Sequence, residues 1–492
     1  MPAPAHAAPR LSRALGAAVL GASAGPAAAQ LPPIPQGDLE VRMQIVTGGL
    51  AGAVDGDAQI SPTDLTPDGT GRMFVSTLGG VVRVLDASGN LLPAPLLTQA
   101  QTNNTPSPIG EWGMTSIAVH PDFNSPGAAG YGKFYTITTE PNAAAAIDFG
   151  QNGDHQDVVK EWTLANPAAN TWGAPGDTVR EVLRVGQPGT PHNTVDLAFD
   201  PSGLLHITTG DGGANTFQSQ DKSTIFGSVF RIDPLNTAGP SIARAGANGQ
   251  YGIPDSNPYL ADPNALDEAF AFGLRSPYRI NPDRLTGRFY IGDVGQSDIE
   301  EINRLIEGAN YGWNDKEGTF RSGQGNGCCR VEPDIPQRNG GITLVEEFDL
   351  TDPVFEYDHG EGVTIIGGFV YRGSLLPELQ GKYVFADLGE GLPSARLFYG
   401  DLATGDVEEF FIDPDGDTFL GQLGPEAGSQ LPLPERIISI GEDENGELYL
   451  LGVGIDPRSG GGLDGVVVRL VPEPASASLL ALGALGLSRR RR

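Results

Sequence analysis

The sequence predicts an all-β fold, a six-bladed β-propeller with long loops between its blades. Three observations support this prediction: a hairpin unit recurs six times between residues 64 and 453, glycine and proline make up about 22% of the chain, and long helical heptads are absent. Each unit is an apolar strand, a turn rich in Asp, Asn and Gly, and a second apolar strand. One hairpin cannot bury its own apolar face, so repeated hairpins predict a closed array. The alternative architecture is a pair of β-sandwiches.

The six hairpins follow one another at uneven spacings of roughly 50 to 90 residues, which excludes a repeat of fixed period. They are DLTPDGTGRMFVST from Asp64, SIAVHPDF with GKFYTITTE from Ser116, DLAFDPSGLLHITTGD from Asp196, RINPDRLTGRFYIGD from Arg279, GGFVYRGSLLPELQGKYVFAD from Gly367 and SIGEDENGELYLLGV from Ser439. Helical signals are few. The stretch IEEINRLIEG at 299–308 is predicted either as a short amphipathic helix or as a strand at the edge of a sheet.

Composition limits the classes of partner. The formal net charge of the 492 residues is −30, and an acidic surface repels phosphate backbones, which excludes nucleic acid as a partner. The same charge suits the binding of divalent cations. The two cysteines, Cys328 and Cys329, are adjacent and match no zinc or CxxC spacing, so they could form a vicinal disulfide or remain two thiols.

The N-terminus is predicted to be a secretory signal peptide over residues 1–30. Arg10 and Arg13 precede an apolar run, and small residues near Ala29 offer a cleavage site. Residues 31–470 are then expected to form the propeller.

The C-terminal segment, residues 471–492, combines a PEP triplet, about 14 weakly apolar residues and a terminal arginine cluster. Fourteen residues in a helix span about 21 Å, short of a hydrocarbon core of about 30 Å, so the segment predicts transient membrane association. It resembles the PEP-CTERM sorting signal of Gram-negative bacteria. That resemblance implies processing by an exosortase and export to the periplasm, cell surface or extracellular matrix.

The third hairpin, within residues 190–213, places two reactive side chains together. Its strands flank the turn DPSG, with His192 just before the first strand and Asp211 just after the second. Pairing of the strands brings an imidazole and a carboxylate to one edge of the sheet. A carboxylate fixes the tautomer of a neighbouring imidazole and raises its basicity, as a general base requires. The alternative is an ordinary loop histidine beside an ordinary GDGG turn.

Three further loops contain candidate binding residues. In residues 109–123 the glycines let a ligand approach the backbone, and Glu111 is expected near the mouth of the central channel. Arg275 lies between an apolar strand and a Ser-Pro turn, so a stiff backbone would hold its guanidinium for a carbonyl or carboxylate. Residues 292–314 are rich in glycine and carboxylates, which suits calcium, although a solvated acidic turn is the alternative.

Four stretches resemble the soluble glucose/sorbosone dehydrogenases: HNTVDLAFDPSGLLHITTGDGG, AFGLRSPYRINPD, GDVGQSDIEEINRLIEGANYGWNDKEG and GGFVYRGSLLPELQGKYVFAD. The resemblance extends roughly over residues 58–455, is strongest at 270–318, and includes the related Hedgehog-interacting-protein-like proteins. It implies a six-bladed propeller that uses pyrroloquinoline quinone (PQQ) and calcium to oxidise aldose sugars, with an external electron acceptor.

The resemblance implies roles for the candidate catalytic and cofactor-binding residues. His192 would abstract the proton of the anomeric hydroxyl while a hydride passes to the quinone, and Asp211 would polarise that histidine. Arg275 would bind the cofactor and stabilise the charge developing on the quinone oxygen. Glu111 would line the cofactor pocket, and Arg436 matches the first of two arginines that hold the carboxylates of PQQ.

The resemblance implies two calcium sites. Gly295 and Gln296 match backbone carbonyls that hold the calcium next to the cofactor. Glu301 and Tyr311 match a second, structural calcium site, to which the tyrosine contributes its carbonyl.

Several positions depart from the family pattern. They are Ile438 in place of the second arginine, Pro191 before the histidine, Thr194-Val195 in place of small residues, Ser276 in place of an asparagine, and the absence of a basic residue near 386–391. A lost charge-assisted hydrogen bond costs about 1.5–3 kcal/mol, so these changes predict weaker binding of PQQ. The alternative function is a non-catalytic extracellular propeller that binds sugar or a protein partner; an unrelated propeller chemistry such as lactone hydrolysis is a more distant one.

Overall fold

The computed structural model describes residues 31–50, 61–105, 112–142, 146–151, 153, 155–213, 216–296, 298–321, 350–389, 395–411, 436–455 and 463–472. The predicted signal peptide, Glu111, the Cys328–Cys329 pair and nearly all of the C-terminal segment lie outside these residues. Within them, no helix is long and apolar enough to cross a membrane.

Strands are the main regular elements of the described chain, and they form successive, largely antiparallel sheets. The first sheet contains β2 (Pro62–Pro67), β3 (Met73–Thr77) and β4 (Val82–Leu85). The second contains β5 (Ser116–Val119), β6 (Lys133–Pro141), β8 (His155–Thr163) and β9 (Thr178–Gln187), with β7 (Phe149–Gly150) at its edge. The third contains β10 (Thr194–Phe199), β11 (Leu205–Thr209), β12 (Ser228–Ile232) and β15 (Ala269–Phe272). The next sheet is β16 (Pro277–Pro282), β17 (Phe289–Asp293), β18 (Ile299–Arg304) and β21 (Phe355–Asp358).

The remaining strands form one eight-stranded sheet and two short pairs. In spatial order the large sheet is β22 (Ile365–Val370), β23 (Tyr383–Asp387), β24 (Arg396–Gly400), β25 (Val407–Phe411), β1 (Gln36–Thr47), β28 (Leu463–Pro472), β27 (Leu448–Ile455) and β26 (Arg436–Glu442). The pairs are β13 (Ile242–Ala245) with β14 (Gly252–Pro254), and β19 (Lys316–Glu317) with β20 (Phe320–Arg321). Short helical turns are α1 (Gln99–Thr102), η2 (Thr216–Gln220) and η3 (Pro377–Leu379).

All six predicted hairpins are confirmed as antiparallel pairs: β2 with β3, β5 with β6, β10 with β11, β16 with β17, β22 with β23, and β26 with β27. The helical alternative for residues 299–308 is wrong, because Ile299–Arg304 forms strand β18, which pairs on both sides with β17 and β21. Burial of both faces in the sheet outweighs the helical period of that stretch.

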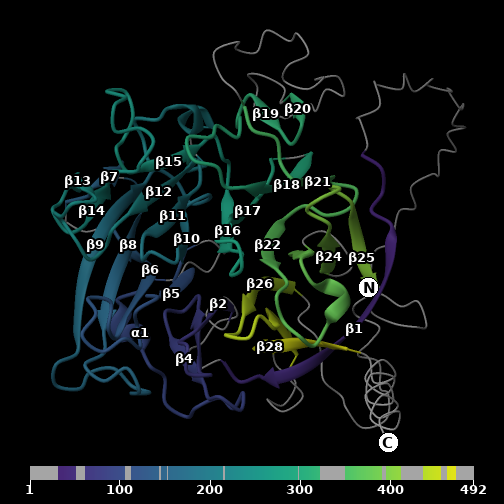
Figure 1. Ribbon diagram of the computed structural model, residues 1–492, viewed down its shortest axis with the longest axis horizontal. Coiled ribbons are helices and arrows are strands. Elements are labelled where there is room, and N and C mark those ends of the chain that lie inside the picture. The colour runs from purple at the N-terminus through teal and green to yellow at the C-terminus, as the bar shows by residue number, and fades with distance from the viewer. Residues whose placement is uncertain are drawn as a thin grey trace, which may run out of the picture.

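The first strand of each sheet packs against the first strand of the next. These contacts run from β2 to β5, β10, β16, β22, β26 and back to β2. Figure 1 shows these strands around the centre of the molecule, with the later strands of each sheet outside them. The fold is therefore all-β and propeller-like, and a pair of separate β-sandwiches is not what forms.

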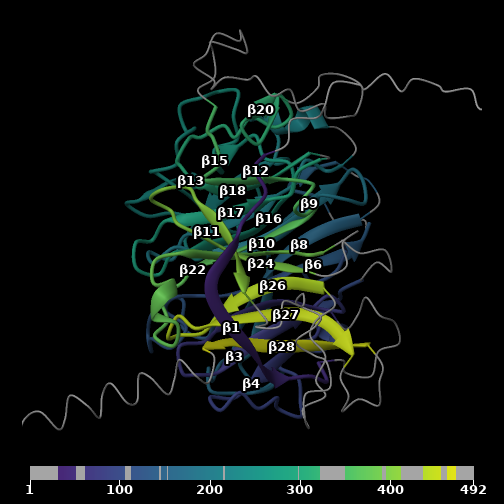
Figure 2. The ribbon, with the colours of Figure 1, turned by 90° about the vertical axis from the view of Figure 1, so that its right-hand side faces the viewer.

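Strand β1 fastens the two ends of the chain together. It pairs in parallel with β25 and antiparallel with β28, so the N-terminal strand lies inside a sheet made of C-terminal strands. Figures 1 and 2 show β1 in purple beside the yellow β28. This pairing leaves neither β25 nor β28 with an open edge.

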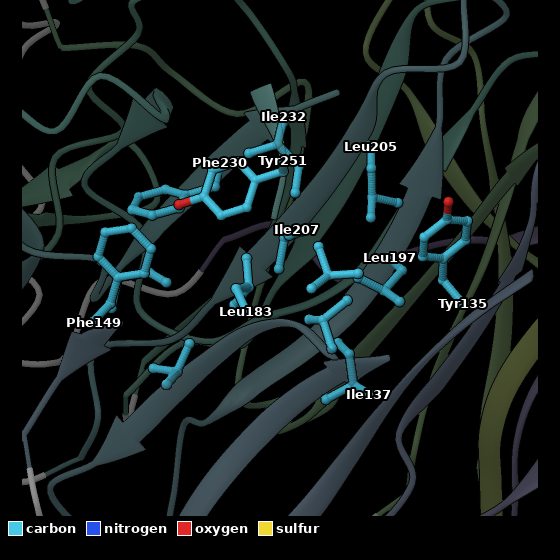
Figure 3. Close-up of a cluster of buried hydrophobic side chains, with 14 of the residues drawn as sticks. Tyr135, Ile137, Phe149, Leu183, Leu197, Leu205, Ile207, Phe230, Ile232 and Tyr251 are labelled. Carbon is cyan, nitrogen blue, oxygen red and sulfur yellow. The ribbon is translucent and has the colours of Figure 1, made fainter. Parts of the chain in front are cut away.

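Apolar side chains fill the spaces between neighbouring sheets. In one such cluster, Tyr135 of β6 packs with Leu197 of β10, Ile207 of β11 and Phe230 of β12, and all four are buried (Figure 3). The cluster joins the β5–β9 sheet to the β10–β15 sheet and fixes the start of β10, where the predicted catalytic histidine lies.

Buried carboxylates also link each sheet to the next. Asp64 accepts the N–H of Ile117 at 3.1 Å, Asp157 that of Thr194 at 3.1 Å, Asp196 that of Ile280 at 2.8 Å and Glu300 that of Ile365 at 2.9 Å. In each case the donor belongs to the first strand of the following sheet. Buried backbone N–H groups need a partner, and here the adjoining sheet provides it.

At the axis, Arg279 joins three sheets. Its Nη1 lies 3.4 Å from Asp196 Oδ1, its Nε donates to Ser439 Oγ at 3.1 Å, and its Nη2 donates to the carbonyl of Thr63. Burial raises the pKa of Asp196 to about 7, and the guanidinium of Arg279 opposes that rise. The contacts hold β2, β10 and β26 at fixed positions around β16.

The Asp157 link predicts a specific dependence of stability on pH. Burial raises the pKa of Asp157 from 3.8 to about 7, so the folded chain keeps a proton that the unfolded chain has lost. The stability contributed by this proton is full below about pH 4 and falls by up to about 1.4 kcal/mol per pH unit as the pH rises through about 7. In Asp157→Asn this part of the slope is expected to disappear.

Urea unfolding between about pH 4.5 and 8 measures this difference. The control is Asp86→Asn, because hydrogen bonds from Asn90 hold the pKa of the exposed Asp86 below its usual value. The change in unfolding free energy caused by Asp86→Asn should therefore be the same throughout this pH range. Parallel stability curves for the wild type and Asp157→Asn would contradict the prediction.

Candidate active site

The hairpin β10–β11 brings His192 and Asp211 into contact, as the sequence predicts. The pairing of Thr194 with Thr209 ends the ladder, and the two side chains meet just beyond it. His192 Nδ1 lies 2.6 Å from Asp211 Oδ1, with 14% of the histidine side chain exposed and the aspartate fully buried. A carboxylate only accepts hydrogen bonds, so Nδ1 carries a proton in this contact.

The backbone of His192 is held in a strained conformation. Its φ is +59°, in the left-handed region that few residues other than glycine adopt. The N–H of Gly212 donates to the carbonyl of His192 at 3.1 Å, and a Cβ on Gly210 would lie 2.6 Å from the same oxygen. Glycine at position 210 therefore lets the two ends of the hairpin approach closely enough for the His192–Asp211 contact.

Asp211 accepts three hydrogen bonds from three parts of the chain. They come from His192 Nδ1 at 2.6 Å, the N–H of Gly213 at 2.8 Å and Trp313 Nε1 at 2.9 Å. Burial raises the pKa of Asp211, but the hydrogen bonds from His192 and Gly213 and the charge of Arg275 outweigh it, and the pKa lies below its usual value. The carboxylate is therefore ionised beside the imidazole at neutral pH.

Arg275 belongs to the same hydrogen-bonded network. Its carbonyl accepts the N–H of Asp211 at 2.7 Å, and its own N–H donates to Asp293 at 3.0 Å. Arg275 as a whole is 8% exposed. Its guanidinium donates from Nε to Gln296 Oε1 at 3.0 Å and from Nη1 to the carbonyl of Val294 at 2.9 Å. No carboxylate in the described part of the chain forms an ion pair with it. A buried cation without a paired anion suits an anionic ligand.

Trp313 was not predicted from the sequence. Its indole N–H donates to Asp211 Oδ2, and its ring lies 5.7 Å from the guanidinium of Arg275, so it touches both partners. Only the motif NYGWN, next to the acidic loop, could have drawn attention to it.

Glu317 is a second residue that sequence reasoning missed. Its Oε1 accepts the N–H groups of Gln296, Asp298 and Ile299 at 2.9, 3.0 and 3.0 Å, which fixes the turn after β17. A Cβ on Gly295 would lie 1.8 Å from the carbonyl oxygen of Ile299, so the turn admits only glycine there. A trans peptide directs its C=O opposite to its N–H, so the Gly295 carbonyl points away from Glu317.

Of the predicted second calcium ligands, the Glu301 carboxylate accepts hydrogen bonds, whereas the bonds of Tyr311 involve its hydroxyl and not the carbonyl expected to bind the metal. Glu301 on β18 accepts the N–H of Gly318 and Asn303 Nδ2, the latter at 3.0 Å. The hydroxyl of Tyr311 donates to the carbonyl of Arg304 at 2.7 Å and accepts the N–H of Ile306 at 3.0 Å. Among the residues that the structure describes, no three His, Cys, Asp or Glu side chains gather to hold a metal ion.

Arg436 is exposed at the first residue of β26. No hydrogen bond or ion pair within the described ranges joins it to His192, Asp211 or Arg275. Ile438, in place of the second arginine, lies at the register shift between Ile437 and Ser439. A polar pocket of about 470 Å³ lies away from the site, beside residues 67–73, 86–90 and 443–445.

Comparison with known families decides the relationship. Residues 61–409, which include β2 to β24, match the family described as Glucose / Sorbosone dehydrogenase. The chain belongs to the glucose/sorbosone dehydrogenase family. Residues 470–492 match the PEP-CTERM protein-sorting motif. Both assignments agree with the resemblances in the sequence.

Relatives of this glucose/sorbosone dehydrogenase family member come from several kingdoms. It is 28% identical to the HIPL1 protein of Arabidopsis thaliana, over 78% of this chain and 59% of that protein. It is 27% identical to the Hedgehog-interacting protein of Mus musculus, over 78% of this chain and 47% of the other. It is 24% identical to the aldose sugar dehydrogenase YliI of Escherichia coli, over 78% of this chain and 84% of that protein. The chain thus spans only about half to three fifths of the plant and mouse relatives.

Solved structures of aldose sugar dehydrogenases share the fold. The apo-form of the soluble aldose sugar dehydrogenase from Escherichia coli aligns with a TM-score of 0.57 at 19% identity, over 88% of this chain and 100% of that one. The PQQ-bound form of an aldose sugar dehydrogenase from Streptomyces coelicolor aligns with a TM-score of 0.53 at 22% identity, over 87% of this chain and 99% of that one.

Replacing Trp313 by phenylalanine tests the network around Asp211. The variant leaves Asp211 Oδ2 buried without its indole donor, which is expected to cost about 1–3 kcal/mol of unfolding free energy beyond the loss of ring volume. Trp172→Phe is the matched control, because the buried Trp172 Nε1 has no hydrogen-bond partner within the described residues. Urea unfolding of both variants gives the comparison. Equal losses of stability would show that the indole hydrogen bond contributes nothing.

Proposed function

We propose that this protein oxidises aldose sugars with PQQ and calcium, and that His192 is the general base. The proposal rests above all on the His192–Asp211 pair, 2.6 Å apart, within one hydrogen-bonded network with Arg275. Family membership and the fold shared with aldose sugar dehydrogenases support it.

The pair has the arrangement that proton abstraction needs. Asp211 holds the proton of His192 on Nδ1, so Nε2 is the atom that takes the proton of the anomeric hydroxyl. The imidazolium that results is stabilised by the buried carboxylate 2.6 Å away. The contact of Nδ1 with Asp211 orients the ring, and the N–H of Gly212 holds the carbonyl of His192.

The residues present fit the cofactor in part. PQQ, when bound, supplies the carbon that accepts the hydride, a chemistry that no side chain of the protein can provide. Arg275 would face its quinone oxygen through Nη2, since Gln296 and Val294 engage Nε and Nη1 and no residue that the structure describes accepts from Nη2. Arg436, and Glu111 outside the described residues, would contact the rest of the cofactor.

Gly295 and Gln296 would hold calcium through their carbonyls. Glu317 takes the N–H groups of this turn, which directs the Gly295 carbonyl to the opposite side. Oxygen ligands from backbone carbonyls suit calcium. The Gln296 side chain donates nothing to the metal in this arrangement, because its Oε1 accepts from Arg275.

The departures from the family pattern are expected to weaken PQQ binding without removing the base. Ile438 supplies no cation, and Thr194 and Val195 are larger than the small residues expected beside the histidine. Pro191 packs within 2.3 Å of where a Cβ of Gly213 would lie, so it fills space next to the pair. These changes favour, as a second candidate, a propeller that binds a sugar or a protein without oxidising it.

We also propose six blades, counting the eight-stranded sheet as two blades that share β1.

Residues 1–30 would be a signal peptide, residues 31–470 the propeller and residues 471–492 the sorting segment. The PEP-CTERM motif implies export, transient membrane association and cleavage by an exosortase. Electrons would leave to an external acceptor, and the acidic surface excludes nucleic acid.

Reconstitution tests the proposed reaction. Protein loaded with PQQ and calcium should reduce an artificial dye when aldoses are added, and His192→Ala and Asp211→Asn should lower the rate at least about a hundredfold. Asp200→Asn, in the turn at the other end of the same hairpin, is the matched control and should keep the rate. Each rate is referred to the folded fraction measured by circular dichroism.

No dye reduction over a broad panel of aldoses would favour the binding function instead. Equal rates for the wild type and His192→Ala would leave oxidation possible but would remove His192 as its base.

A further inference from the structure

A second tryptophan, Trp112, contacts the turn that carries His192. Its indole Nε1 donates to the carbonyl of Thr190 at 3.2 Å, from the segment before β5 to the segment before β10. On the other side of the pair, Trp313 Nε1 donates to Asp211 Oδ2 at 2.9 Å. Two indole N–H groups from different parts of the chain therefore contact the two halves of the His192–Asp211 pair.

The carbonyl of Thr190 is the point at which the turn of residues 190–193 is fastened. It also accepts Asn193 Nδ2 at 2.8 Å, a bond that closes the turn on itself. The carbonyl of Asn193 accepts the N–H of Gly210 at 2.9 Å. His192 lies inside the turn with φ at +59°, a conformation that persists only where the surroundings support it. Two donors to one carbonyl oxygen provide such support.

The indole of Trp112 is itself held in place. Its ring packs against that of His155, with centroids 4.2 Å apart and an angle of 35° between the planes. His155 begins β8 and is buried, so it gives the indole a firm surface. The N–H of Gly113, the next residue, donates to Thr139 Oγ1 at 3.0 Å, and its carbonyl accepts the N–H of Thr139 at 3.1 Å. The indole N–H is thus fixed relative to the β5–β9 sheet.

We propose that Trp112 is a positioning residue, whose indole N–H fixes the turn that directs His192 toward Asp211. It acts through the carbonyl of Thr190 and not through contact with the reacting atoms. A misplacement of about 1 Å at a catalytic group can cost about a hundredfold in rate, so the position of this turn controls the base. The effect on rate rests on the proposed oxidation, whereas the His192–Asp211 contact is already present in the cofactor-free protein.

Proton NMR of the cofactor-free protein tests the positioning directly. The Nδ1–H proton of His192, held against a buried carboxylate, should give a downfield signal that exchanges slowly with water and is assigned by its loss in His192→Ala. Trp112→Phe keeps an aromatic ring beside His155 but has no N–H for Thr190. Exchange of the Nδ1–H should be at least about tenfold faster in this variant, because the contact with Asp211 opens more often.

The protein loaded with PQQ and calcium gives a second readout. Trp112→Phe should lower kcat about tenfold and leave KM for the aldose within about twofold, because the base is displaced while the contacts of the sugar remain. Absence of dye reduction by the wild type would count against the proposed oxidation. The exchange rate at Nδ1 would still decide on Trp112, because it is measured without cofactor.

Trp162→Phe is the matched control. Trp162 lies on β8, the strand that begins at His155, and its Nε1 donates to Thr136 Oγ1 at 2.9 Å within the same sheet. This variant also loses an indole hydrogen bond, but one that does not reach the turn of residues 190–193. It should lose stability and keep the exchange rate, kcat and KM of the wild type. If Trp112→Phe does not fold, Trp112→Leu, which also lacks the N–H, takes its place.

Three results would overturn the inference. A wild-type Nδ1–H without protection, or one that exchanges at the same rate in Trp112→Phe, would show that the indole does not hold the turn. A rise in KM with kcat unchanged would show that the indole contacts the sugar instead. Equally fast exchange in Trp162→Phe would show that the effect reflects a general loss of stability.

Discussion

The site depends on one buried carboxylate, that of Asp211. It joins His192 at the start of one sheet to Trp313, which lies 102 residues beyond Asp211, and its own N–H is bound to the carbonyl of Arg275. A fully buried carboxylate without these donors would carry a large desolvation cost. Because the three donors satisfy it, the same group can hold the histidine in one tautomer and keep an ionised charge beside it.

The position of this carboxylate follows from the ring of first strands. His192 precedes β10, Arg275 precedes β16 and Arg436 begins β26, so each stands at the start of a strand that lines the axis. Carboxylates such as Asp157 and Asp196 fasten these strands to one another through backbone N–H groups. Residues far apart in the sequence can share one site because the sheets repeat the same strand order around the axis.

The sequence could predict what depends on local pattern. The hairpins follow from alternating apolar residues and turn residues, and the His192–Asp211 contact follows from their places at the two ends of one hairpin. The contacts of Trp112, Trp313 and Glu317 could not be predicted, because each depends on the packing of separate sheets and loops. The segment 299–304 was ambiguous because its apolar spacing suits a helix as well as a strand, and only its neighbours β17 and β21 decide.

The most direct measurement of the central claim is a titration of the cofactor-free protein with PQQ in saturating calcium, followed by tryptophan fluorescence. Trp313 lies 5.7 Å from the guanidinium that would bind the quinone, so the wild type should show saturable quenching at one site. Arg275→Gln should bind at least about tenfold more weakly, because it loses a charge-assisted hydrogen bond. Absence of saturation in the wild type, or equal affinity of the two proteins, would contradict a quinone site shared by Arg275 and His192.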